Sequence, residues 1–285
     1  MRFAINPPNV GAFGDPGVLV RLALESEQAG WDGYFIWDYL GAHDTAPVAD
    51  PWVTLGGVAA ATERIRLGAL VTPVPRRRPW KLARELVTLD HLSGGRAVFG
   101  IGIGSDEERE YSAYGEPVEA RVHGDMLDEA MTVIAELWSG ESFSFEGEHY
   151  RLDDVLHLPR PVQQPRIPVW VAGQWPGRRP FRRAARWDGV FPLFGMTTGT
   201  PDQVAEMAAF VRAERVAQLG AEAAGAPFDI VHADWEPARP PEEQLPLLEA
   251  WAAAGVTWHL SSWWPAADLE DVRAVIRRGP PRAGG

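Results

Sequence analysis

Hydrophobic and polar residues alternate along the chain with two periods, one typical of buried strands and one typical of amphipathic helices. Short apolar runs bounded by turn residues predict eight strands, at residues 2–6, 33–37, 65–72, 97–103, 169–172, 189–193, 228–233 and 256–260. Between them, apolar stripes predict helices at residues 16–29, 50–62, 79–92, 121–138, 181–187, 201–223, 241–254 and 268–277.

This alternation predicts an α/β protein built as a (β/α)8 TIM barrel rather than a doubly wound sheet. The rhythm is interrupted once, at residues 105–165, where a long helix and a small hairpin at residues 143–151 replace the expected single helix. We interpret this segment as an extended crossover insertion after strand four. We therefore expect one barrel domain over residues 1–279, followed by a flexible tail at residues 280–285.

The carboxyl ends of the strands are the expected position of the active site in such a barrel. Aromatic residues recur there, and the chain has 13 tryptophans, some of which must also fill the seam between helices and strands. Trp263 and Trp264 follow a strand side by side, so both cannot point the same way. These features predict a large apolar pocket with aromatic walls, suited to a flat heteroaromatic ligand.

Composition and charge exclude several classes of function. The formal net charge is −12, which disfavours nucleic acid or an anionic membrane as a partner. No apolar run is long enough to span a bilayer. Cysteine is absent, which excludes disulfides and thiolate metal sites and favours a cytoplasmic location. A near absence of lysine, with many alanines and glycines, indicates a bacterial source.

Three local motifs leave alternatives open. Gly100, Gly102 and Gly104 lack the spacing of a dinucleotide fingerprint, and indicate space for a ring system inside the barrel. The run 76–78 is three arginines, which is either an anion-binding loop or a solvated one. The stretch 173–179 precedes a helix, so its backbone amides could bind a phosphate.

The histidines offer an alternative chemistry. His232, Asp234 and His259 come from neighbouring late strands, where some metal-dependent hydrolases carry ligands. The early strands supply no second histidine cluster, so we predict no metal site. A hydrolase barrel, or a barrel that only binds a ligand without catalysis, stays open as the alternative function.

Several motifs together resemble the bacterial luciferase-like family of flavin- and F420-dependent oxidoreductases. They are Arg64-Ile65-Arg66-Leu67-Gly68, Leu89-Asp90-His91-Leu92-Ser93-Gly94-Gly95-Arg96, the alternating glycines 100–104, Trp138-Ser139-Gly140, residues 145–150, the proline-rich run 159–170 and Ala184-Ala185-Arg186-x-Asp188-Gly189. The resemblance covers most of the chain to about residue 195.

The resemblance implies a monooxygenase using reduced FMN, fed by a separate flavin reductase, or an enzyme transferring hydride with F420, acting on a small apolar organic molecule. It also implies a homodimer. It places Leu70 and Val71 under the cofactor ring, often through a cis peptide bond, and Gly173 near the cofactor phosphate. Combined with the strand ends, it gives the cofactor-binding candidates Asn6, Asp38, Leu70, Val71, Arg76, Gly102, Gly104, Ala172, Gly173 and Gln174.

The expected proton-handling residues lie just after strand two and around the end of strand seven. F420-type members commonly carry Asp-His after strand two, whereas this chain has Asp38 and Tyr39. The phenol has an ordinary pKa near 10, so it is a weaker base at neutral pH than an imidazole. His43 could compensate. The catalytic candidates are Asp38, Tyr39, His43, His232 and Asp234.

Overall fold

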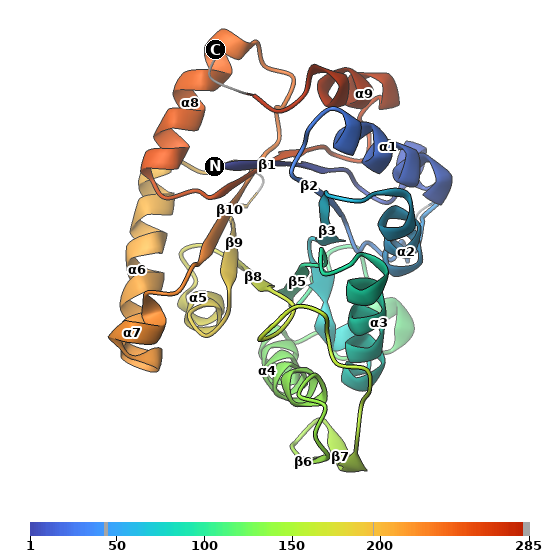
Figure 1. The fold of residues 1–285 in the computed structure, drawn as a ribbon, viewed down its shortest axis with the longest axis vertical. Coiled ribbons are helices and arrows are strands. Elements are labelled where there is room, and N and C mark those ends of the chain that lie inside the picture. The colour runs from blue at the N-terminus through green and yellow to red at the C-terminus, as the bar shows by residue number, and fades with distance from the viewer. Residues whose placement is uncertain (43–44, 196, 282–285) are drawn as a thin grey trace.

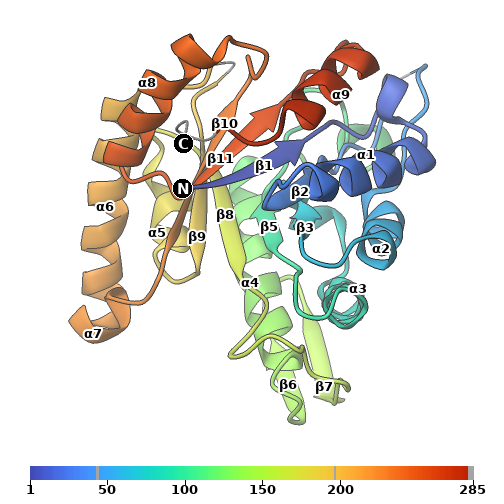
Figure 2. The same ribbon diagram turned by 45° about the horizontal axis from the view of Figure 1, so that its top comes forward.

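The computed structural model describes residues 1–42, 45–195 and 197–281 of the chain. Parallel strands form a barrel wall, and helices surround it (Figures 1 and 2). In order, the barrel strands are β1 (Arg2–Asn6), β2 (Gly33–Ile36), β3 (Arg66–Ala69), β5 (Phe99–Gly102), β8 (Val169–Gln174), β9 (Gly189–Leu193), β10 (Asp229–Asp234) and β11 (Trp258–Ser262). The predicted TIM barrel is confirmed.

Two contacts between strands close the barrel. β1 pairs with β11, with Ala4 opposite Leu260. A parallel bridge between Leu67 and Ala97 joins β3 to the residues before β5. The predicted strand at residues 65–72 is interrupted, because it leaves the ladder after Ala69 and resumes as the short strand β4 (Thr72–Pro73) beside β5.

The helices lie where the apolar stripes predicted them. They are α1 (Pro16–Gln28), α2 (Pro51–Ala61), α3 (Pro79–Leu92), α4 (Ala120–Leu137), α5 (Arg178–Ala184), α6 (Pro201–Leu219), α7 (Ala221–Ala224), α8 (Pro241–Ala253) and α9 (Leu269–Arg278), with short 3-10 turns η1 (Gly11–Phe13), η2 (Val74–Arg76) and η3 (Ser112–Tyr114). The predicted single helix at residues 201–223 is wrong. It ends at Gly220, whose φ of 81° and ψ of 163° leave the helical region.

Between β5 and β8 the chain makes a long excursion through η3, α4 and the antiparallel hairpin of β6 (Phe143–Glu146) and β7 (Arg151–Val155). The hairpin projects away from the barrel beyond α4 (Figure 1). The predicted hairpin is therefore confirmed, and the division of the whole chain into one domain stays a prediction.

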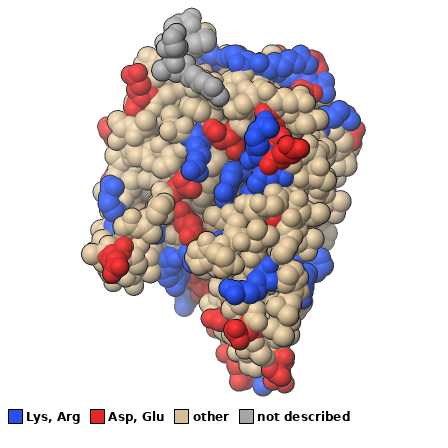
Figure 3. All heavy atoms as spheres, viewed as in Figure 1, with Lys and Arg blue, Asp and Glu red and all other residues tan. Residues whose placement is uncertain are grey.

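The helices found in the described residues lack the combination of length and apolar character that crossing a membrane requires. On the face shown in Figure 3, positive and negative side chains are interspersed rather than gathered into a patch of one sign. This face therefore presents no broad basic surface of the kind that binds a polyanion.

Candidate active site

Large aromatic side chains fill the lower barrel, and its carboxyl end is lined by small residues on one side and tryptophans on another. Phe35, Trp170 and Trp258 lie inside the strands, and the ring centroids of Trp170 and Trp258 are 5.3 Å apart. All three side chains are fully buried or nearly so. Because successive residues of a strand point to opposite faces, the interior positions continue upward as Trp37, Ala172 and Gly102.

Val71, Gly102 and Ala172 form a low surface across the carboxyl end of the barrel, which we call the floor. A Cβ placed on Gly102 would lie 3.0 Å from Cγ2 of Val71 and 3.9 Å from Cβ of Ala172, so the glycine keeps this floor low. The peptide bond between Leu70 and Val71 is cis, as the resemblance implied. Leu70 itself is buried beneath the floor, where its Cδ2 would lie 2.3 Å from a Cβ on Gly100.

Asn6 supplies a polar group at the same, carboxyl end of the barrel. Its side chain is 1% exposed, and its Nδ2 donates to Oγ of Ser262 at 3.2 Å. Its Oδ1 has no hydrogen-bond partner among the described residues. A buried amide oxygen without a donor costs free energy, so this position suits a ligand that carries an N–H or O–H group.

Tryptophans from three strand ends form one wall of the mouth. Trp235 and Trp264 stack with centroids 4.4 Å apart, and Trp37 meets both edge-on, at 6.0 and 6.1 Å. Trp264 remains 38% exposed. Aromatic walls of this kind offer a large apolar contact area at the entrance to a pocket.

Asp38 lies at the end of β2 but is held by cations. Its carboxylate accepts from Nη2 of Arg76 at 3.0 Å and from Nη2 of Arg77 at 2.8 Å. The indole Nε1 of Trp52 donates to it at 3.3 Å. Arg76 also lies 2.9 Å from Glu110, in the excursion after β5. The structure thus brings Asp38 and Arg76 together as a buried network, which leaves little capacity for either to meet a ligand.

The other predicted residues near the mouth have varied surroundings. Tyr39 is half-buried, and its backbone is held by the Asn9 side chain through bonds of 2.8 and 3.2 Å. Gln174 accepts from the Gly195 amide at 3.0 Å. His43 lies outside the described residues.

At two of the predicted glycine positions, close packing leaves no room for a larger residue. A Cβ on Gly104 would lie 2.7 Å from the Tyr111 hydroxyl, and φ at Gly104 is +71°. A Cβ on Gly173 would lie 2.2 Å from Cβ of Pro180, so this glycine allows α5 to approach β8. Both positions need glycine for the fold, whatever else they contact.

His232 and Asp234 point away from the barrel interior, so the structure does not bring them to the mouth. The interior positions of β10 are Val231 and Ala233, and the alternating residues face α8. His232 stacks on Trp251 of α8 with centroids 3.8 Å apart. Its Nδ1 lies 3.3 Å from Nδ1 of His259.

Burial and neighbouring charges shift the pKa values of this outer cluster. Burial, followed by the nearby His259, lowers the pKa of His232 to about 3, so its imidazole is neutral at physiological pH. Burial alone would raise the pKa of Asp234, but His259, the Glu236 amide and Arg239 lower it to about 2. Within the described residues, no group of three His, Asp or Glu side chains is arranged to hold a metal ion.

Sequence reasoning gave no role to Glu110 or Ser262. Glu110 lies in the irregular excursion, where no periodic pattern shows that its side chain returns to the mouth. Ser262 ends β11 and faces inward, which only the register with Asn6 reveals.

The family model described as luciferase-like monooxygenase matches residues 3–240. The chain belongs to this family. The match extends from β1 to the turn after β10, and it therefore includes the whole floor at the carboxyl end of the barrel.

Curated relatives of this luciferase-like chain are similar over somewhat more than half of it. The F420-dependent glucose-6-phosphate dehydrogenase of Nakamurella multipartita is 35% identical over 168 residues, covering 56% of this chain and 48% of that protein. The enzyme of the same name from Kineococcus radiotolerans is 39% identical over 170 residues, covering 57% and 48%. This chain thus matches about half the length of these relatives.

Solved structures share the fold along nearly the whole chain. An F420-dependent secondary alcohol dehydrogenase, in complex with an F420–acetone adduct, superposes with a TM-score of 0.80 at 18% identity over 98% of both chains. A monooxygenase from Streptomyces bottropensis gives a TM-score of 0.77 at 23% identity over 97% of both. At these identities the likeness shows the fold.

Proposed function

We propose that this luciferase-like chain is an F420-dependent oxidoreductase that binds its cofactor at the carboxyl end of the barrel. The observation that carries the proposal is the unpartnered Oδ1 of Asn6 at the carboxyl end of the barrel, the end that also holds the low floor of Val71, Gly102 and Ala172. The named relatives at 35–39% identity are F420-dependent, which favours F420 over FMN. When bound, F420 supplies two-electron hydride chemistry.

The residues of the floor fit a flat ring. Val71 offers an apolar surface, and Gly102 and Ala172 add no side chain larger than a methyl group beside it. Asn6 would orient the ring by accepting a hydrogen bond from an N–H on its polar edge. The tryptophan wall would exclude water from the reacting face.

The substrate is proposed to be a small, uncharged and largely apolar organic molecule. The mouth offers Trp37, Trp235 and Trp264 as contact surface. The nearby arginines Arg76 and Arg77 are already paired with Asp38, so they are poor receptors for a sugar phosphate. A secondary alcohol or ketone fits this environment better than the substrate in the names of the curated relatives.

Proton handling is assigned to Tyr39, with His43 as a second candidate. Tyr39 directly follows Asp38 at the end of β2, and Asp38 is held by two arginines. We expect Tyr39→Phe to lower turnover and to change its pH profile, while cofactor affinity stays within twofold. Unchanged turnover and pH profile in both Tyr39→Phe and His43→Ala would contradict the assignment.

Titration of the purified protein with F420 and, separately, with FMN tests the cofactor. We expect saturable F420 binding that Asn6→Ala weakens at least tenfold, whereas Gln218→Ala on the outer helix α6 leaves it unchanged. Binding of FMN alone would overturn the choice of F420 and favour a monooxygenase supplied by a separate flavin reductase. Binding of neither cofactor would overturn the proposal.

Three further parts of the proposal concern the setting of the protein. We propose that it forms a homodimer, which light scattering of the purified chain would test. We place it in the cytoplasm of a bacterium, in agreement with the absence of cysteine. Cell fractionation of the native host would contradict this placement if it recovered the protein elsewhere.

A further inference from the structure

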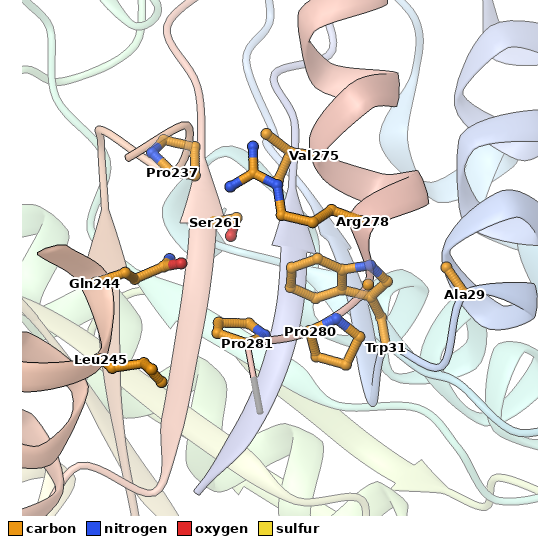
Figure 4. A pocket seen from close by; sticks show the side chains of 11 residues that line it. Ala29, Trp31, Pro237, Gln244, Leu245, Ser261, Val275, Arg278, Pro280 and Pro281 are labelled. Carbon is orange, nitrogen blue, oxygen red and sulfur yellow. The ribbon is translucent and has the colours of Figure 1, made fainter. Parts of the chain in front are cut away.

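A cavity lies outside the barrel wall, in the helical layer next to β11. It has a volume of about 440 Å³, within the range of small-molecule sites. α9 packs against α1 and α8 packs against α6, so the outer face of β11 between α8 and α9 is left for this cavity (Figures 1 and 4). It is lined by Ala29, Trp31, Pro237, Gln244, Leu245, Ser261, Val275, Arg278, Gly279, Pro280 and Pro281.

The cavity is separate from the proposed cofactor site. Ser261 faces outward into the cavity, while the next residue, Ser262, faces inward and receives the hydrogen bond of Asn6. The wall of the barrel therefore divides the two spaces. The inference below goes beyond the proposed function and does not depend on it.

Polar groups without partners converge on this cavity. Gln244 is 5% exposed and Ser261 1% exposed, and neither side chain makes a hydrogen bond to a described residue. Figure 4 shows Gln244, Ser261 and Arg278 directed toward one another from α8, β11 and the end of α9. The polar atoms of Gln244 and Ser261 are not shielded from water, so they face the cavity and are available to a bound polar group.

Charge and shape define the chemical class of the ligand. Among the lining residues that the structure describes, Arg278 is the only charged one, and none is acidic. One of its nitrogens donates to the Arg239 carbonyl at 3.2 Å, which leaves its other donors for a ligand. A carboxylate would accept from Arg278, Gln244 and Ser261 together.

The rest of the cavity is apolar and suits a flat body. The indole Nε1 of Trp31 is occupied by the Ile276 carbonyl at 3.0 Å, so the ring presents its apolar surface. Pro280 and Pro281 lie opposite Gln244 and close the lower side, as Figure 4 shows. Val275 and Leu245 complete the apolar lining.

We propose that this cavity is a second binding site, which takes a small organic carboxylic acid with an aromatic or compact apolar body. The carboxylate lies among Arg278, Gln244 and Ser261, and the apolar body lies between Trp31 and the two prolines. The site is non-catalytic, because no general base or nucleophile other than the Ser261 hydroxyl lines it in the described structure.

Calorimetric titration of the full chain with naphthylacetate, without cofactor, tests the site. We expect saturable binding, with the matched neutral naphthylacetamide at least tenfold weaker. Arg278→Met should weaken naphthylacetate binding at least tenfold, because it removes the charge and keeps the length of the side chain. Arg277→Met, at the neighbouring exposed arginine that does not line the cavity, is the matched control and should bind as the parent does.

A second variant separates the ligand contact from folding. Gln244→Glu keeps the shape of the side chain but places a negative charge beside the carboxylate, so it should weaken naphthylacetate more than naphthylacetamide. Melting temperatures show whether each variant is folded. Absence of saturable binding to the parent chain, equal affinity for acid and amide, or affinity unchanged by Arg278→Met would overturn the proposal.

Discussion

Nη2 of Arg77 lies 2.8 and 3.0 Å from the two carboxylate oxygens of Asp38, in a network that is mostly shielded from water. Asp38 follows β2 and Arg77 follows η2, so the ion pair joins two loops of the mouth. Glu110 extends the network into the excursion after β5 through its contact with Arg76. The arginine run therefore fixes loop positions, in addition to any effect on a ligand.

Asp38→Asn should destabilise the protein, because it removes the countercharge of Arg77 and one of the two countercharges of Arg76. Breaking a buried ion pair from one side costs about 3–5 kcal/mol, and we expect the lower part of this range because Arg77 is partly exposed. Urea unfolding measures the change. Glu85→Gln, in the exposed pair with Lys81, is the control and should change stability by less than about 1 kcal/mol. Equal effects of the two substitutions would contradict the structural role of Asp38.

Arg96→Lys should also be strongly destabilising, although the charge is kept. The buried Arg96 guanidinium donates to the carbonyls of Ser93, Ile65, Ala59 and Thr62 and to the Thr62 hydroxyl, at 2.7–2.9 Å. A lysine ammonium has three donors and no planar fork, so at least two carbonyls lose their partner, at about 1–3 kcal/mol each.

Thermal and urea unfolding of Arg96→Lys measure this loss. Arg160→Lys, at an exposed position, is the matched control and should be nearly neutral. A near-neutral Arg96→Lys would show that the carbonyls find other donors.

Stability should fall as the pH drops from about 6.5 toward 3, because of His232. Its pKa is lowered to about 3 in the folded protein, from a reference of 6.5, so in this window the unfolded chain binds a proton that the folded chain does not. The slope from this group is about 1.4 kcal/mol per pH unit. Asp234, with a pKa of about 2 against a reference of 3.8, adds a further loss at the acidic end.

His232→Phe should remove this slope while keeping a ring against Trp251. The free energy of unfolding is measured at several pH values between about 4 and 7. His149→Gln, in the turn between β6 and β7, is the control and should keep the slope. A His232→Phe variant with the parent's slope would mean that another group titrates in this window.

Trp264→Ala should weaken substrate contact more than it weakens the fold. The side chain is 38% exposed, and its stacking on Trp235 contributes about 0.5–1.5 kcal/mol beyond its buried area. We expect KM to rise several-fold with a smaller change in kcat and F420 affinity unchanged. Trp80→Ala, also partly exposed but packed near Tyr150 beyond the mouth, is the control. An unchanged KM would remove Trp264 from the substrate site.

The fold could be predicted from the sequence because its signals are local. The apolar stripe of residues 79–92 gives α3 (Pro79–Leu92) at the predicted bounds. The motif around Arg96 identified the family, and the structure shows its role as structural: Asp90 accepts from the backbone and side chain of Gln163, and Arg96 ties α2 to β3. A motif can therefore identify a family without containing the residues that react.

The site could be predicted only in part, because it depends on register. β10 is buried on both faces, so no polar alternation shows which of its residues face the interior. Sequence reasoning placed His232 and Asp234 at the right end of the strand, but it could not determine that they face α8. The pairing of Asp38 with Arg76 is equally non-local, since it depends on how the loop after β3 folds back.

Gly102→Ala provides the most direct test of where the cofactor binds. The new methyl group would lie 3.0 Å from Cγ2 of Val71, a tight contact that a small shift of the valine relieves, so we expect a stability loss below about 2 kcal/mol. The same methyl group would stand on the floor of the proposed site, and F420 affinity should fall at least tenfold. Gly56→Ala, in helix α2 with open space around its Cβ, is the control, expected to stabilise by about 0.5–1 kcal/mol and to keep the affinity. If Gly102→Ala were destabilised yet bound F420 as the parent does, the ring would have to lie elsewhere in the barrel.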